Sequence, residues 1–219
     1  TTAELFGHPA DEVYVAGGMI QLTLADFRRT GSMLVDVPDI GLMTEFIAEF
    51  DLYMGGGAVG GEGISFSMGA QITQAPFDER GAGDGLRVLF LSSEGVVEVW
   101  YRDALVARSG NGLLELHVAA FVPVVISHTE EEGLSVSHNG ALLLDGVMLA
   151  GWSPLPTWRV GFGARTGVDK ADYHALDNLR IATGSKFRRQ DVALEVSLNS
   201  QENTQSRVNF SYYAEPVVS

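Results

Sequence analysis

The chain has 219 residues, 46% of them hydrophobic, which is enough for one large domain with a substantial apolar core. It contains no cysteine, which excludes disulfides, thiolate metal sites and cysteine nucleophiles. Its net charge of −14 argues against nucleic acid as a partner, because an acidic surface repels phosphate backbones. No apolar run approaches the roughly 20 residues that a membrane-spanning helix needs, and the start at Thr1 is typical of a mature or excised fragment.

Hydrophobic residues recur with a period of two along most of the chain, which is typical of β-strands. In residues 44–53 one face of the predicted strand carries Phe46, Ala48, Phe50 and Leu52. The same alternation predicts further strands at Ile64–Met68, Leu134–Ser137, Ala141–Leu144, Trp158–Phe162, Leu194–Leu198 and Val208–Tyr212. No window carries a helical stripe over three turns, and the 26 glycines cluster between the strands. The pattern therefore predicts an all-β sandwich or barrel.

The composition changes after Ile181, where residues 182–190 are polar and basic. We place a domain boundary near Gly184, which gives one domain at residues 1–184 and a closing hairpin or linker at residues 185–219. The last 35 residues are too few for a sandwich of their own.

Three stretches, in chain order, resemble the concanavalin A-like fold of L-type (legume-type) lectins. They are Phe46–Tyr53 with the glycine-rich turn and Gly61–Phe66, then Gly85–Phe90 with Val97–Tyr101 and Ala104–Ala107, and finally Trp158–Gly167 with His174–Ile181. The hairpin predicted by Asn139-Gly140 fits between the second and the third. The resemblance covers residues 5–182 and implies a jelly-roll sandwich of antiparallel sheets.

The resemblance also implies a ligand site in loops at one end of the sandwich. In the family, the aspartate of an Ala-Asp-Gly loop hydrogen-bonds sugar hydroxyls, and here the longer carboxylate of Glu62 takes that position. The residues implied to bind ligand are Gly61, Glu62, Gly63, Arg165, Thr166, His174 and Asp177. For His174, a structural hydrogen bond that closes the last loop stays open as the alternative.

Calcium-binding members of the family carry an Asp-rich loop after the strand that Leu86–Phe90 resembles. In this chain the loop is Leu91-Ser92-Ser93-Glu94-Gly95, with one carboxylate, whereas calcium takes six to eight oxygen ligands. We therefore predict no cofactor, while a calcium ion held by other residues stays an alternative.

The C-terminal stretch resembles the closing hairpin of an immunoglobulin-like filamin or TIG repeat. The residues that carry this resemblance are Ala193–Asn199 and Val208–Pro216. It implies neighbouring immunoglobulin-like repeats in the same chain, and hence a multidomain protein outside the cell or on its surface.

The segment Glu49-Phe50-Asp51 is similar to the Glu-x-Asp-x-x-Glu motif of β-glucanases, which share the fold. The second glutamate of that motif would stand at Met54, so the pair of carboxylates needed for glycoside hydrolysis is incomplete. We therefore predict no enzyme activity and no catalytic residue. The main hypothesis is a carbohydrate-recognition or adhesion module that binds a glycan. The alternative is a structural domain that binds a surface protein, and a glycoside hydrolase is a distant third.

Overall fold

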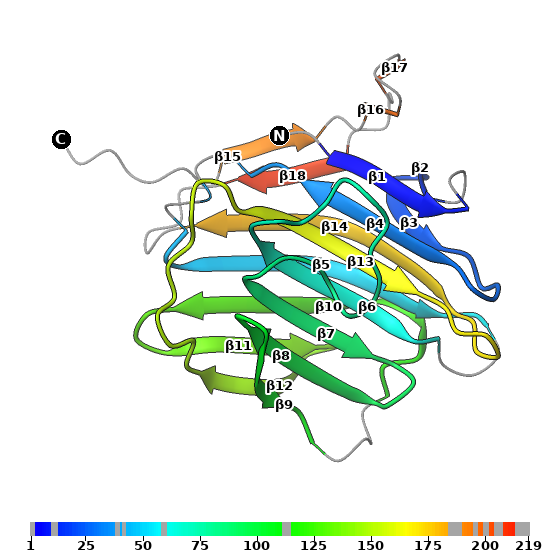
Figure 1. Cartoon of the computed structure of the whole chain (residues 1–219). Coiled ribbons are helices and arrows are strands. Elements are labelled where there is room, and N and C mark those ends of the chain that lie inside the picture. The colour runs from blue at the N-terminus through cyan, green and yellow to red at the C-terminus, as the bar shows by residue number, and fades with distance from the viewer. Residues whose placement is uncertain are drawn as a thin grey trace.

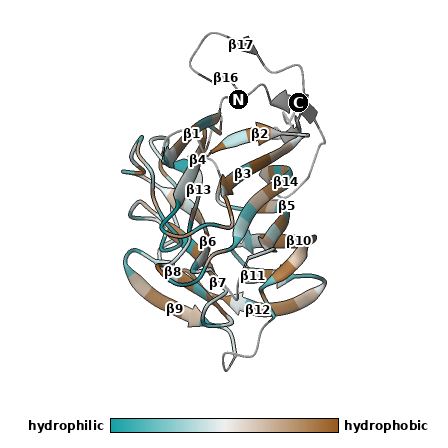
Figure 2. Ribbon diagram, turned by 90° about the vertical axis from the view of Figure 1, so that its right-hand side faces the viewer, coloured by the Kyte–Doolittle hydropathy of each residue, from teal (hydrophilic) through white to brown (hydrophobic). Residues whose placement is uncertain are grey.

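Two seven-stranded antiparallel sheets face each other in this computed structural model (Figure 1). Seen from the side, the strands of one sheet lie on the left and those of the other on the right (Figure 2). The structure describes residues 3–9, 13–37, 40, 43–57, 61–110 and 115–183, together with the backbone of four short strands between residues 190 and 212. No helix in the described residues is long and apolar enough to cross a membrane.

The first sheet, sheet A, has the strand order β1-β4-β13-β6-β7-β8-β9. Its strands are β1 (Ala3–His8), β4 (Thr30–Val35), β13 (Arg159–Arg165), β6 (Gly63–Gly69), β7 (Leu86–Leu91), β8 (Val96–Tyr101) and β9 (Ala104–Arg108). A strand from late in the chain, β13, thus lies between two early ones.

The second sheet, sheet B, has the order β12-β11-β10-β5-β14-β3-β2. Its strands are β12 (Ala141–Val147), β11 (Gly133–His138), β10 (Val118–Thr129), β5 (Phe46–Gly55), β14 (Tyr173–Thr183), β3 (Met19–Thr23) and β2 (Tyr14–Ala16). Here β14 is the late strand between two early ones. Each sheet is therefore held together by pairs of strands that are distant in sequence.

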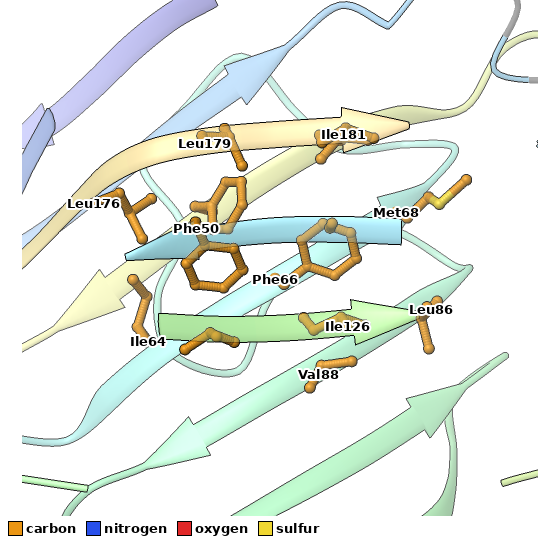
Figure 3. Packing of buried hydrophobic residues seen from close by; sticks show 14 of the residues in the cluster. Phe50, Ile64, Phe66, Met68, Leu86, Val88, Ile126, Leu176, Leu179 and Ile181 are labelled. Atoms are coloured by element: carbon orange, nitrogen blue, oxygen red, sulfur yellow. The ribbon is translucent and has the colours of Figure 1, made fainter. Parts of the chain in front are cut away.

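The core lies between the sheets, where alternate residues of each strand point inward. Buried and half-buried residues alternate along β5 from Phe46 to Tyr53, which confirms the predicted inward face. Side chains of β5, β10 and β14 meet those of β6 and β7 (Figure 3). Phe162 of β13 links the layers, with its ring centroid 5.2 Å from that of Phe50 and 5.4 Å from that of Phe66, both edge-on. Such edge-to-face pairs add to the free energy gained from apolar burial.

The outer face of sheet A is covered by the loop between β6 and β7. The ring of Phe77 lies directly on β13, and an added Cβ at Gly163 would come within 2.4 Å of its Cδ2 atom. The Ser65 hydroxyl donates a hydrogen bond to the Asp78 carbonyl at 2.9 Å and is buried beneath the loop. The Gly-Phe-Gly sequence of β13 therefore has a packing cause, since Phe162 fills the core while Gly161 and Gly163 leave room for Phe77.

The predicted all-β concanavalin A-like sandwich is therefore observed, and the strands predicted within residues 44–162 are all present. The predicted Asn139-Gly140 turn is confirmed by positive φ angles of 50° and 76°. The alternation did not predict the four strands in residues 3–35, nor the long strand β10.

In the C-terminal segment, β15 (Gln190–Leu194) pairs antiparallel with β18 (Val208–Tyr212), and β16 (Ser197–Leu198) pairs with β17 (Glu202–Asn203). The boundary near Gly184 lies outside the described residues. That boundary and the immunoglobulin-like character of this segment stay predictions.

Candidate functional site

A pocket of about 260 Å³ opens where β13 ends and β6 begins. Its lining residues are Arg28, Thr30, Glu62, Arg165, Thr166, Gly167 and Val168. The strand register assembles them, because Arg165 pairs with Gly63 on one side and with Thr30 on the other. Three of the residues implied by the lectin resemblance thus meet in one depression of the surface.

Glu62 forms one wall of this pocket. Its backbone N–H donates a hydrogen bond to the Arg165 carbonyl at 3.2 Å, which fixes the loop before β6 against the end of β13. Its half-buried carboxylate has no hydrogen bond or ion pair with any described residue. An added Cβ at Gly167 would lie 2.7 Å from Oε1 of Glu62, so a side chain at position 167 would displace the carboxylate. The arrangement leaves a carboxylate available to accept hydrogen bonds.

Arg165 is held in place by a carboxylate beneath it. Its Nε and one terminal nitrogen donate to the two oxygens of Glu79, at 2.8 and 2.6 Å. Glu79 is 1% exposed, and this burial raises the pKa of its carboxyl while the hydrogen bonds from Arg165 oppose the rise. The same hydrogen bonds raise the pKa of Arg165. The pair is therefore bidentate and rigid, and its two charges neutralise each other.

The far wall comes from the turn before β4, which hydrogen bonds attach to the residues that follow β13. Thr166 N–H donates to the Arg29 carbonyl at 2.9 Å, and Arg29 N–H donates to Oγ1 of Thr166 at 2.8 Å. One residue further out, Arg28 N–H donates to the Gly167 carbonyl at 2.9 Å. Arg28 has a φ of 58°, a conformation that non-glycine residues seldom adopt. These contacts place its exposed side chain at the rim of the pocket.

A buried carboxylate supports the Gly61–Gly63 loop from behind. Gly61 N–H donates to Oδ2 of Asp172 at 2.6 Å, and Nδ1 of His117 lies 2.9 Å from Oδ1 of the same side chain. Asp172 is completely buried, so these contacts form in a low dielectric, where each is strong and its loss is costly. The loop that carries Glu62 is thereby attached to the start of β14.

His174 lies next to this carboxylate and is also fully buried. The Thr23 hydroxyl is 3.1 Å from the Asp172 carbonyl and 2.6 Å from Nδ1 of His174. Because that hydroxyl has one hydrogen to donate to the carbonyl, it accepts one from Nδ1, which makes His174 the neutral Nδ1–H tautomer. Its Nε2 atom has no partner among the described residues. Burial lowers the pKa of His174 from 6.5 to about 4, which agrees with the neutral form.

The loop between β7 and β8 does not fit a calcium ion. Its one carboxylate, Glu94, accepts a hydrogen bond from Arg108 at 2.7 Å, and Ser92 donates its hydroxyl hydrogen to the Gly61 carbonyl at 2.8 Å. No group of three or more His, Cys, Asp or Glu residues in the described ranges is arranged to hold a metal. Ser92 instead joins this loop directly to the Gly61 loop.

The other implied site residues lie outside the pocket. Gly61 and Gly63 flank Glu62 without lining it, and His174 has no exposed surface from which to contact a ligand. His174 makes the structural hydrogen bond that the sequence left as the alternative. Asp177 pairs with Asp51 across β14 and β5, in sheet B, and does not line the pocket.

The partial glucanase motif lies on β5, apart from this pocket. Glu49 forms an ion pair with Arg180, and Asp51 accepts a hydrogen bond from Asn178 at 2.7 Å. Met54, at the position of the missing glutamate, is buried. Both carboxylates thus have neighbouring partners on the sheet.

Several residues that build the site carry no signal in the sequence. Arg28, Glu79 and Asp172 stand in no recognisable motif, and Asp172 reaches Gly61 across 111 positions of sequence. The lectin resemblance, which sets Glu62 in the position of the family's aspartate, was the signal that did point to the pocket.

Comparison with known proteins identifies the fold. No family model matches the chain, and no curated protein matches its sequence. Among solved structures, it is similar to the exoplasmic/lumenal domain of VIP36 in its Ca2+/Man-bound form, with 13% identity, 80% of each chain covered and a TM-score of 0.62. It is also similar to the carbohydrate recognition domain of Emp47p, with 17% identity, 80% of this chain and 85% of the other covered, and a TM-score of 0.59.

A third similar structure is the legume lectin-like domain from Entamoeba histolytica, with 12% identity, 84% of this chain and 90% of the other covered, and a TM-score of 0.58. These likenesses agree with the two antiparallel sheets described above. The chain therefore has the concanavalin A-like fold of legume-lectin-like domains.

Proposed function

We propose that this chain is a carbohydrate-recognition module that binds a glycan in the pocket beside Glu62. The observation that carries the proposal is the carboxylate of Glu62, which lines an open pocket and has no hydrogen-bond partner among the described residues. A carboxylate held in this way accepts hydrogen bonds from two neighbouring sugar hydroxyls. The neighbouring Thr30 adds a further hydroxyl to the lining.

The similar structures support this proposal because their names state a bound sugar or a carbohydrate-recognition role. VIP36 has forms bound to Ca2+ with mannose, and Emp47p is represented by its carbohydrate recognition domain. The VIP36 domain is exoplasmic or lumenal, which supports an extracellular or cell-surface place for this chain. We further propose that the chain acts without enzymatic activity and alongside immunoglobulin-like repeats.

A domain that binds a surface protein is the second candidate. It is favoured by the poor fit of the β7–β8 loop to calcium, because the resemblance implies that the metal fixes the sugar-contacting loops in the family. Against it, Ser92 and Asp172 hold the Gly61 loop from two sides through direct hydrogen bonds.

A glycan array tests the two candidates directly. The purified chain is applied once with calcium and once with a chelator, and we expect glycan binding in both conditions. Glu62→Ala should abolish this binding, whereas the control Glu131→Ala, which lines a separate pocket with Glu45 and His128, should leave it intact. An array without binding in either condition would refute glycan recognition and favour a protein partner.

A further inference from the structure

One arginine at the pocket differs from every other arginine that the structure describes. The chain has 28 Asp and Glu residues against 14 Lys and Arg, so its arginines are surrounded by carboxylates. Those that form ion pairs with one are Arg29, Arg80, Arg87, Arg108, Arg159, Arg165 and Arg180. Arg102 donates to the Gly151 carbonyl at 2.9 Å and lies over the ring of Tyr101. Within the described residues, the guanidinium of Arg28 alone has no partner.

The backbone holds Arg28 at this place. Its N–H is bonded to the Gly167 carbonyl, and its φ of 58° lies in the left-handed region, which costs a non-glycine residue free energy. The side chain is exposed, and Val168, which is 68% exposed, lies on the same rim. A fixed backbone therefore presents an unpaired guanidinium to whatever enters the pocket.

The charges of the pocket define the ligand that would complement it. Arg165 and Glu79 satisfy each other, so the charges left for a ligand are the Glu62 carboxylate and the Arg28 guanidinium. The carboxylate requires hydrogen-bond donors such as sugar hydroxyls. The guanidinium offers five N–H donors in a plane, a geometry that matches the paired oxygens of a carboxylate or a sulfate.

On the basis of the glycan-binding function proposed above, we propose that the pocket selects sugars carrying an anionic group, which binds to Arg28 while neighbouring hydroxyls bind to Glu62. The anionic group is the carboxylate of a uronic acid or the sulfate of a sulfated sugar. The net charge of −14 repels anions over the surface as a whole, so an anionic sugar binds here only through short-range contacts such as the one with Arg28.

The test compares matched sugars that differ in one group. Binding of oligosaccharides of glucose, galactose and mannose is measured by calorimetry against the corresponding uronates and sulfate esters, at low and high salt. We expect at least one anionic sugar to bind about tenfold more tightly than its neutral counterpart, with the advantage shrinking as salt rises. The advantage should disappear in Arg28→Ala and persist in part in Arg28→Lys.

Arg159→Ala is the matched control, because it removes the same charge at the opposite end of β13 and should keep the preference for anionic sugars. Glu62→Gln should weaken the binding of neutral and anionic sugars alike. Equal binding of neutral and anionic sugars, or an unchanged preference in Arg28→Ala, would overturn the role of Arg28 and leave glycan recognition standing. Failure of every sugar to bind would overturn both proposals.

Discussion

The amide of Gly61 donates a 2.6 Å hydrogen bond to the buried carboxylate of Asp172, which joins two loops separated by 111 residues. A side chain at position 61 would crowd this contact, because an added Cβ there would lie 3.0 Å from Cβ of Asp172 and from Cε1 of His174. The contact fixes the loop that carries Glu62, so the shape of the candidate pocket depends on a residue that does not line it.

Asp172→Asn should therefore destabilise the protein and loosen the pocket together. The amide retains one acceptor oxygen but loses the charge that binds the Gly61 N–H and His117, and we expect a loss of about 2–3 kcal/mol of unfolding free energy. Urea unfolding measures the loss. Asp169→Asn, an exposed change in the same loop, serves as the control and should stay within about 0.5 kcal/mol of wild type. Equal stability of the two variants would show that the network contributes nothing.

His174 should make the protein less stable as the pH falls. In the unfolded chain its pKa is near 6.5, whereas in the folded protein burial lowers it to about 4. Between these values the unfolded state binds the extra proton, so the stability present above pH 6.5 declines toward pH 4, by about 3 kcal/mol in all. Burial also lowers the pKa of His128 and His138, and both add to the decline in the same direction.

The variant His174→Gln isolates the contribution of this residue to the loss of stability at low pH. Unfolding free energies measured from pH 7 to pH 4 should fall less steeply in the variant than in wild type. Parallel curves would mean that His174 is not the group that titrates.

The effects of substituting Arg165 and Glu79 on the free energy of unfolding should be strongly coupled. Arg165→Ala leaves the Glu79 carboxylate buried without its partner, and we expect a cost of about 3 kcal/mol at neutral pH. Because burial then favours the protonated acid, the stability of this variant should rise as the pH is lowered toward the ordinary pKa of glutamate. In urea unfolding, the double variant Arg165→Met/Glu79→Leu should lose less than the sum of its two single changes. Strict additivity would contradict a direct interaction.

Gly63 should tolerate no side chain. Its φ is 143°, and an added Cβ would come within 2.2 Å of the Phe90 carbonyl oxygen, which belongs to the neighbouring strand and cannot move freely. We expect Gly63→Ala to cost about 2–4 kcal/mol by thermal and urea unfolding. Gly110→Ala is the matched control, since nothing lies within 4 Å of its added Cβ, and it should be close to neutral. A stable Gly63→Ala protein would mean that the loop before β6 can shift.

The sandwich could be predicted because side chains alternate along a strand wherever one face is buried. Phe46, Phe50 and Leu52 follow this rule along β5, and the prediction held there. It also located β6 at Ile64–Met68, but it did not predict that both faces of this strand are buried, because the Phe77 loop covers Ser65 and Ser67. A loop that folds back over a sheet produces no periodic hydrophobic pattern in the sequence.

The candidate site could be predicted only where the lectin resemblance supplied a position. Glu62, Arg165 and Thr166 were identified in this way and line one pocket. Arg28 and Glu79 were missed because their places depend on the register of β4 against β13 and on the path of a long loop. Neither the register nor the loop path can be read from local alternation.

The central positions of β13 and β14 have a consequence for how the chain acquires its structure. Residues up to about 150 contain both neighbours of each strand, β4 and β6 in one sheet and β3 and β5 in the other, but not the strands that join them. A nascent chain of that length therefore carries unpaired strand edges in both layers. Closure of loops well over a hundred residues long must wait until β13 and β14 have been synthesised, so folding of the sandwich is expected to be slow, and strand-binding chaperones would act in that interval.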